Sequence, residues 1–146
     1  MIKIHVETDP KYNPVKNEVI SDGVFHLFNS KDIIEANISF IFGDDELLNK
    51  LKKEFFNLDH LTDVIAFRLN DYKEKNIEGE IYISIPRAEE NAIEFKEPLN
   101  RELGRLIIHG CLHLLGFKDE SDNEKTDMRK QEDHYLGKTE WDHLYG

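Results

Sequence analysis

Alternating apolar and polar residues mark short segments of the chain as β-strands. The N-terminal segment MIKIHVE alternates residue by residue, and GEIYISI at residues 79–85 does the same. Residues 35–42 and 62–67 are short and rich in β-branched and aromatic residues, which also favours strands. The polar stretch NDYKEKNIE, residues 70–78, has the composition of a turn between the third and fourth strands. We therefore expect four strands.

Apolar residues spaced three and four apart predict about five helices, each of which buries one face. Polar capping residues and first-turn prolines indicate where four of them begin: Asp44 or Asp45, Pro86, Pro98, and Ser121 or Asp122. The inward faces that we expect are Val15, Val19, Val24, Leu27 and Phe28; Leu47, Leu48, Leu51 and Phe55; Ala88, Ala92 and Phe95; and Met128 and Tyr135. Gly23 should interrupt the first helix, and the last should end at Leu136 and Gly137.

These elements predict an α+β fold in which one domain, residues 1–146, packs helices on a four-stranded sheet. No repeat or Gly/Ser/Pro-rich linker divides the chain. No apolar stretch approaches the roughly 20 residues that a membrane-spanning helix needs, so we expect a cytoplasmic protein without a membrane partner. Cys111 is the only cysteine, which excludes an intramolecular disulfide, and we expect it to pack in the core.

The chain is strongly acidic, with a formal net charge of −11. Such a charge repels polyanions at long range, so strong nonspecific nucleic-acid binding is disfavoured and DNA is not an expected partner. Two basic clusters remain that can hold phosphates, or that are simply solvated helix faces. They are Lys50, Lys52 and Lys53, and Arg101 and Arg105.

Candidate chemistry concentrates in the sequence LGRLIIHGCLHLLGFKD, residues 103–119. His109 and His113 stand four apart in an apolar run, so on a helix their imidazoles project from one face about 6 Å apart. Gly116 can end the helix in a left-handed conformation, and Asp119 can then fold back beneath the imidazoles. Two nitrogens and one carboxylate with an open fourth position are typical of a catalytic metal site. The alternative is a pair of ordinary helix histidines.

The same skeleton, HExxHxxGxxH, occurs in metzincin proteases, in which the Glu after the first His is the general base. Gly110 occupies that position here. The scaffold for a metal is therefore present, and the acid that a peptidase of this mechanism needs is absent.

Three blocks give the chain a resemblance to the YbeY family of bacterial rRNA maturation factors, which are single-strand-specific metallo-endoribonucleases. They are TDVIAF at 62–67, GEIYIS at 79–84 and HGCLHLLGFKD at 109–119. The resemblance implies a mixed sheet, a zinc ion in a cleft beside it, and a role in the 3′-end maturation of small-subunit (16S) rRNA and in ribosome quality control. It places the two helix ligands on His109 and His113.

The sequence departs from that family at two positions. The third ligand of the family is usually a His, and Asp119 stands there, so manganese, iron or nickel are alternatives to the zinc that we expect first. An arginine that the family typically carries before the third strand corresponds to Phe56. Arg68 and Arg105 are candidate substitutes for holding a phosphate, or else surface residues.

We therefore expect a metal-dependent endoribonuclease that hydrolyses single-stranded RNA, with His109, His113 and Asp119 as ligands and the ribosomal small subunit as partner. Arg105 and Glu120 are the candidate catalytic residues, with other nearby acids, Glu102 and Asp122, as further candidates for the base. Two other functions stay open: a metallohydrolase of another substrate class, such as a peptidase, and a ribosome-associated module whose metal is only structural. In the C-terminal part, we expect His134 and His143 to lie away from the metal, and Trp141 and Tyr145 to pack or to stack on a base.

Overall fold

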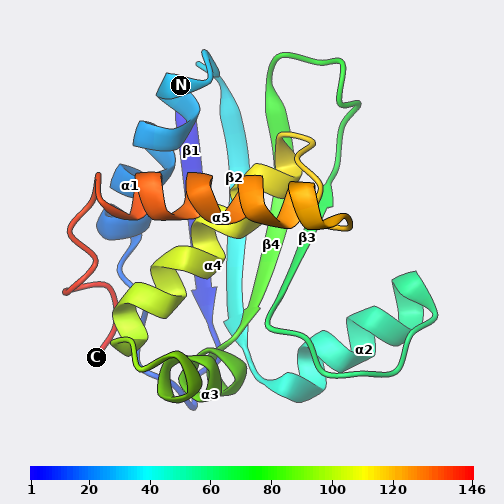
Figure 1. The fold of residues 1–146 in the computed structure, drawn as a ribbon, viewed down its shortest axis with the longest axis vertical. Coiled ribbons are helices and arrows are strands. Elements are labelled where there is room, and N and C mark those ends of the chain that lie inside the picture. Colours follow the sequence, from blue (N-terminus) through cyan, green and yellow to red (C-terminus); the bar gives the residue numbers. More distant parts are fainter.

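The computed structural model describes all 146 residues, which form one four-stranded mixed sheet and five helices (Figure 1). In chain order the elements are β1 (Ile2–Thr8), α1 (Asn17–Ser30), β2 (Ala36–Gly43), α2 (Asp45–Phe56), β3 (Val64–Arg68), β4 (Ile77–Ser84), α3 (Ile85–Phe95), α4 (Leu99–Leu114) and α5 (Asp122–Leu136). The predicted α+β class and the order of its elements are confirmed. No helix is long and apolar enough to cross a bilayer.

The sheet has the strand order β1-β2-β4-β3. β1, β2 and β4 run parallel, whereas β3 runs antiparallel to β4 and forms one edge of the sheet. Alternate residues of β2 and β4 point into the core and are buried, and the residues between them lie on the other face. α1, α4 and α5 lie together on the core-facing side (Figure 1).

The helix α4 is the centre of the molecule. It contacts α1, α3, α5, β3 and β4, and most of its residues are buried. Glycines permit two of these close contacts, because a Cβ at Gly110 would lie 2.8 Å from Cγ2 of Ile81 and a Cβ at Gly104 would lie 2.6 Å from Cδ2 of Trp141. Packing against three helices and two strands fixes the position of this helix and therefore of the histidines that it carries.

Most of the predicted helix boundaries are confirmed, and the caps explain two of them. Asp44 caps α2 by accepting a hydrogen bond from the backbone N–H of Leu47 at 3.0 Å. Ser121 and Glu124 form a reciprocal capping box at the start of α5, which anchors the segment that follows α4.

Three expectations about the helices are wrong: one about where α1 is interrupted and two about which side chains face inward. α1 continues through Gly23 because the indole of Trp141 packs against that residue, so the glycine serves a close approach and not a break. Phe55 of α2 and Phe95 of α3 were expected inward, yet 61% and 48% of their surfaces are exposed. α2 extends beyond the sheet (Figure 1), and of its residues only Leu48 is buried.

The C-terminal tail packs against the rest of the chain, which was one of the two alternatives expected for Trp141 and Tyr145. Trp141 is buried, its indole N–H donates to the carbonyl of Leu136 at 3.2 Å, and Tyr145 forms a bridge with Val15. Cys111 is buried in the core as predicted, and burial raises the pKa of its thiol.

A methyl group at Gly104 tests how tightly the tail and α4 are packed. We expect Gly104→Ala to lower the free energy of unfolding by about 1–3 kcal/mol, because the new Cβ overlaps the indole of Trp141. Gly137→Ala is the control, since the nearest atom there is 3.6 Å away. Urea unfolding of both variants measures the difference, and equal stabilities would contradict the packing described here.

Candidate metal centre

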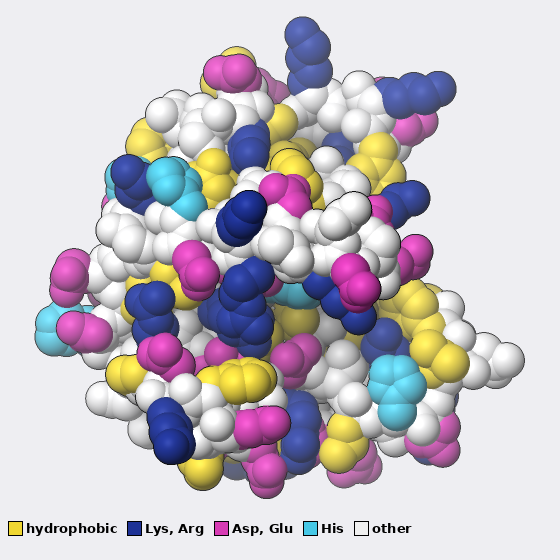
Figure 2. Space-filling model, viewed as in Figure 1, with side chains coloured by type: hydrophobic (Ala, Val, Ile, Leu, Met, Phe, Trp, Pro, Cys, Tyr) yellow, Lys and Arg dark blue, Asp and Glu magenta, His cyan; other side chains and the backbone are white.

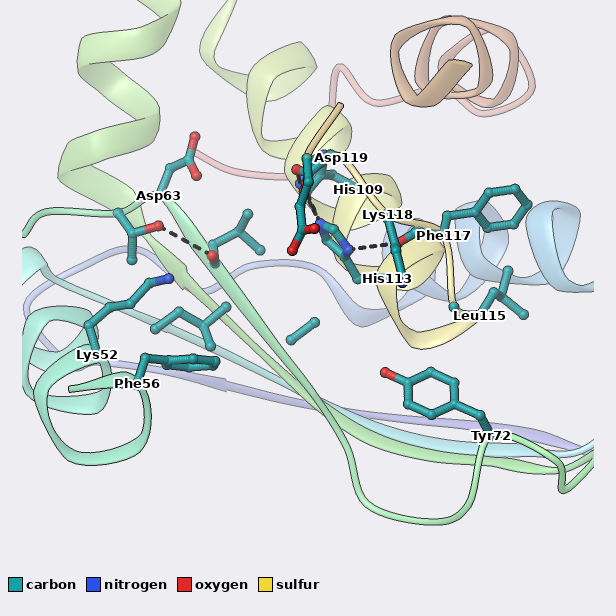
Figure 3. A pocket seen from close by; sticks show the side chains of 16 residues that line it. Lys52, Phe56, Asp63, Tyr72, His109, His113, Leu115, Phe117, Lys118 and Asp119 are labelled. Atoms are coloured by element: carbon teal, nitrogen blue, oxygen red, sulfur yellow. Dashed lines mark hydrogen bonds and ion pairs between the residues drawn. The ribbon is translucent and has the colours of Figure 1, made fainter. Parts of the chain in front are cut away.

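Two imidazoles and one carboxylate meet above the C-terminal half of α4 (Figure 3). The Nε2 atoms of His109 and His113 are 3.0 Å apart, and each lies 3.3 Å from Oδ2 of Asp119. Ligands in a tetrahedral zinc site at about 2.0–2.1 Å from the ion are separated by roughly 3.3 Å. The three atoms therefore have the spacing of ligands that share one ion.

The turn after α4 brings Asp119 back to the histidines. Gly116 has a φ of +99°, a left-handed conformation that glycine adopts without steric strain. The N–H groups of Gly116 and Phe117 donate to the carbonyls of His113 and Leu112, which closes the helix end. The predicted glycine turn and the approach of Asp119 are both confirmed.

Hydrogen bonds at Nδ1 determine how the histidines present their other nitrogen. Nδ1 of His109 lies 2.6 Å from Oε2 of Glu132, and Nδ1 of His113 lies 2.9 Å from the carbonyl oxygen of Phe117. Both partners are acceptors, so in neutral imidazoles Nδ1 carries the hydrogen and Nε2 keeps its lone pair. Two lone pairs and a carboxylate oxygen then converge without a hydrogen among them, and this arrangement fits a cation.

Glu132 of α5 is the functional residue that sequence reasoning missed. Its side chain is 3% exposed, and it accepts hydrogen bonds from His109 and from Nη1 of Arg105 at 3.1 Å. A buried carboxylate behind a ligating histidine fixes the tautomer of the ring and raises its basicity. The sequence held one signal: Glu132 lies four residues after Met128, on the face of α5 that is otherwise apolar and buried.

Arg105 lies behind His109 and not in the cleft. Its guanidinium binds Glu102 through Nε and Nη2 and Glu132 through Nη1, and its side chain is 13% exposed. The two carboxylates use the donors that a phosphate would need. In this structure Arg105 holds Glu132, the partner of the candidate ligand His109, in place, and its donors are occupied, so the structure does not provide the predicted contact with a phosphate.

Arg68 is also occupied elsewhere. Its Nη1 donates to the carbonyl of Leu114 at 2.7 Å, and Nη2 donates to three carbonyls of residues 71–76. The side chain therefore ties the loop after β3 to the end of α4, and neither of the two arginines proposed for a phosphate is free to bind one.

The candidate metal centre lies in a cleft of about 820 Å³ beside the edge strand β3. Its walls come from α2, from β3 and the residues on either side of it, and from the end of α4 with the segment that follows. The residues that line it are Lys52, Phe56, Thr62, Asp63, Val64, Ile65, Ala66, Tyr72, His109, His113, Leu115, Gly116, Phe117, Lys118, Asp119 and Glu120. Glu120 is thus placed in the cleft as expected. Glu102 is buried against Arg105 instead, and His134 and His143 are exposed outside the ligand group.

Gly110 shows why the base of the protease skeleton is missing. This residue faces β4, where Ile81 leaves no room for a Cβ, so a glutamate at position 110 would enter the core and not the cleft. Packing of α4 on the sheet therefore excludes that acid from this position.

Comparison with known proteins is consistent with this geometry. The family model described as Endoribonuclease YbeY matches residues 5–140 of the chain. The chain belongs to the YbeY family. A relative from Karelsulcia muelleri, named Endoribonuclease YbeY, is 37% identical over 136 residues, 93% of this chain and 94% of the relative. A relative of the same name from Flavobacterium psychrophilum is 46% identical over 108 residues, 73% of this chain and 75% of the relative.

The fold agrees with a solved structure as well. The solution structure of TM1509 from Thermotoga maritima is similar to this chain with a TM-score of 0.60 and 28% sequence identity, covering 94% of this chain and 88% of that one. The three blocks that carried the resemblance to the YbeY family, residues 62–67, 79–84 and 109–119, fall on β3, β4 and the end of α4. They form the strand beside the cleft, the strand beneath α4, and the candidate metal centre.

The pKa values of two supporting groups favour the ligand state. Burial, with the neighbouring His109, lowers the pKa of His113 below its usual value of 6.5. Burial alone would raise the pKa of Glu132, but its hydrogen bond to His109 and the charge of Arg105 outweigh burial, so its pKa lies below 4.5. His113 thus stays neutral and Glu132 stays ionised near neutral pH.

The link between Glu132 and His109 predicts a specific effect on metal affinity. We expect Glu132→Gln to weaken binding of a divalent ion about 10- to 100-fold, because the charge that orients and polarises His109 is lost. Asp133→Asn removes the same charge from the exposed neighbouring position and should leave the affinity unchanged. Competition with a chromogenic chelator measures both affinities, and equal values would contradict the role of Glu132.

The two pKa shifts also predict how stability of the metal-free protein depends on pH. His113 takes up a proton less readily in the folded than in the unfolded chain, so stability should fall as the pH drops below 6.5. Glu132 stabilises the fold while ionised, and this contribution is lost as the pH falls below 4.5 towards its lower folded pKa. Urea midpoints measured in chelator from pH 7 to pH 4 test this, and Glu132→Gln should remove the second part only.

Proposed function

We propose that the protein is a metal-dependent endoribonuclease that hydrolyses single-stranded RNA. The observation that carries the proposal is the convergence of three acceptor atoms, from His109, His113 and Asp119, on the floor of an open cleft. Membership of the Endoribonuclease YbeY family supports RNA as the substrate. Zinc is the ion that we expect first, and the oxygen ligand from Asp119 makes manganese, iron or nickel acceptable alternatives.

The residues of the cleft have distinct parts in such a reaction. When bound, the ion supplies Lewis-acid activation of water and of a phosphoryl oxygen. Glu132 keeps His109 in the tautomer that presents Nε2, and the carbonyl of Phe117 does the same for His113. Glu120 is the carboxylate of the cleft that is neither a ligand nor held by another side chain, so we assign it the acceptance of a proton from the attacking water.

The cellular role is part of the same proposal, and the resemblance to the YbeY family supports it. We propose that the protein acts in the cytoplasm on small-subunit (16S) rRNA, in its 3′-end maturation and in ribosome quality control. Under this proposal the small ribosomal subunit is the partner.

One observation favours a peptidase as the second candidate. β3 is an edge strand, and Val64, Ile65 and Ala66 line the cleft, so an extended peptide has a free strand edge beside the ligands. Against this reading, Gly110 leaves the protease base absent and packing excludes it. A purely structural metal is less well supported, since structural sites are closed by four protein ligands whereas three converge here.

Metal content and cleavage, measured together, test the proposal. The purified protein should carry about one divalent ion per chain and cleave single-stranded RNA but not casein, and a chelator should abolish cleavage. Asp119→Ala should lower metal affinity at least about tenfold. Glu120→Ala is the matched comparison, because it should keep the ion and lose cleavage.

Each other outcome has a definite meaning. Full metal occupancy in Asp119→Ala would remove Asp119 from the ligand set. Chelator-sensitive cleavage of casein without cleavage of RNA would establish the peptidase alternative. Unfolding on chelation with no cleavage of either substrate would assign the metal a structural role.

A further inference from the structure

The structure distinguishes among the three lysines of α2. Lys52 lines the metal cleft, whereas Lys50 and Lys53 line a separate hollow with Glu46, Asn49 and Glu54. Lys53 lies 3.7 Å from Asp59, and Lys52 has no carboxylate within 4.0 Å. In a chain whose net charge is −11, a basic side chain without an acidic partner beside a metal centre calls for an anionic occupant.

An exposed aromatic ring accompanies Lys52. Phe56 lies one helical turn later, lines the same cleft, and is 44% exposed. One side of its ring stacks on Phe67, with centroids 5.8 Å apart and an interplanar angle of 21°. Phe67 is held in turn by edge contacts with Phe55 and Tyr82, so the ring of Phe56 stands on a fixed aromatic support.

Hydrophobic side chains are exposed over α2 and the segment that leads into β3, on the right-hand side of Figure 2. The largest of them are Phe55, Phe56, Leu58 and Leu61. Of these four, only Phe56 lines the cleft. Figure 3 shows Lys52 against the cleft side of the Phe56 ring, with its ammonium directed into the cleft, and the Nζ atom lies 4.6 Å from the ring centroid.

We propose that Lys52 and Phe56 form a nucleotide subsite, in which Phe56 stacks on a base of single-stranded RNA next to the scissile linkage and Lys52 binds the phosphate of that nucleotide. This inference rests on the proposed function, because it places the RNA in the same cleft as His109 and Asp119. Besides Lys118, which also lines the cleft, it gives the cleft a cation next to an aromatic ring, which Arg68 and Arg105, bound to other groups, do not supply.

The chemistry of a nucleotide matches both side chains at once. A base stacked on an aromatic ring gains more than an exposed ammonium does on the same ring, so a base displaces the Lys52 ammonium from Phe56. The lysine stem is flexible, and the released ammonium then meets the phosphate one sugar away from the base. Stacking is tolerant of sequence and requires an unpaired base, so this subsite selects single strands over duplexes.

A second aromatic ring lies at the other end of the cleft. Tyr72 is 59% exposed, lines the cleft near Gly116, and has the guanidinium carbon of Arg68 5.0 Å from its ring centroid. Figure 3 places Phe56 and Tyr72 on opposite sides of the histidines. A strand that stacks on Phe56 and continues across the metal centre therefore runs towards Tyr72.

The role of Lys52 is tested by comparing Lys52→Gln with Lys53→Gln, since each variant removes one positive charge from α2. We expect Lys52→Gln to raise KM for single-stranded RNA about tenfold with kcat within about twofold of the parent, which is the pattern of a lost binding contact. The slope of log KM against log salt should become shallower by about 0.7, the value for one phosphate contact on a single strand. Lys52→Arg should restore KM, and Lys53→Gln should change neither quantity.

Rapid-mixing fluorescence with an oligoribonucleotide that contains 2-aminopurine tests the part of Phe56 before any cleavage occurs. The holoprotein should quench the fluorophore by stacking, Phe56→Leu should lose the quenching, and Phe56→Tyr should keep it. Phe55→Leu is the control, because Phe55 touches Phe67 but does not line the cleft. Equal effects of Lys52→Gln and Lys53→Gln on KM, or quenching that persists in Phe56→Leu, would overturn the subsite.

Binding and cleavage separate this inference from the proposed function. Quenching that depends on Lys52 and Phe56, in a protein that cleaves no RNA, would support the subsite and refute hydrolysis. Cleavage of RNA by the parent that is insensitive to both variants would refute the subsite and leave the proposed hydrolysis in place.

Discussion

The structure depends on a buried ion network that surrounds one face of α4. Glu102 and Glu132 share the single guanidinium of Arg105, and Asp119 adds a third carboxylate beside His109 and His113. Asp63 is joined to the same network through Asn91, so four carboxylates face one guanidinium, and a divalent cation at the ligand atoms would offset part of this excess negative charge. Because unpaired charge is costly away from water, a cation at the candidate ligand atoms would stabilise this arrangement.

That network also explains how distant parts of the chain cooperate. Asn91 of α3 donates to Asp63, at the entrance of β3, and to Glu102 of α4. Glu102 binds Arg105, Arg105 binds Glu132 of α5, and Glu132 orients His109. An unbroken chain of hydrogen bonds therefore runs from the wall of the cleft, through the interior, to the candidate metal ligand His109. Members of such a network hold one another in a single arrangement, which is what a reaction that needs fixed ligands requires.

The cleft combines a rigid and an exposed side. The side with the candidate ligands is carried by α4, most of whose residues are buried, and the far side is carried by α2, of which only Leu48 is buried. Precise placement of ligands needs the rigid side, and contact with a long flexible substrate needs the exposed side. The exposed rings of α2, which would be unfavourable on an inert surface, fit this division of roles.

Much of the metal centre followed from the sequence because its elements are local. The spacing of His109 and His113, the left-handed turn at Gly116 and the return of Asp119 all lie within eleven residues, so helix geometry alone brings them together. The strands and most helix limits were predictable for the same reason, since alternation and capping are properties of short segments. Phe55 failed this reasoning because an apolar spacing indicates a face but does not say that anything covers it.

Only the tertiary structure decided which charged side chains act at the site. Arg105 stands four residues before His109. Nothing in the sequence shows that its guanidinium binds Glu132, which lies 27 residues after Arg105. In the same way Lys52 and Lys53 are adjacent in the sequence, yet a rotation of about 100° per residue directs one into the cleft and the other away from it. Local patterns fix helices and turns, whereas the pairing of charges depends on how those helices pack against one another.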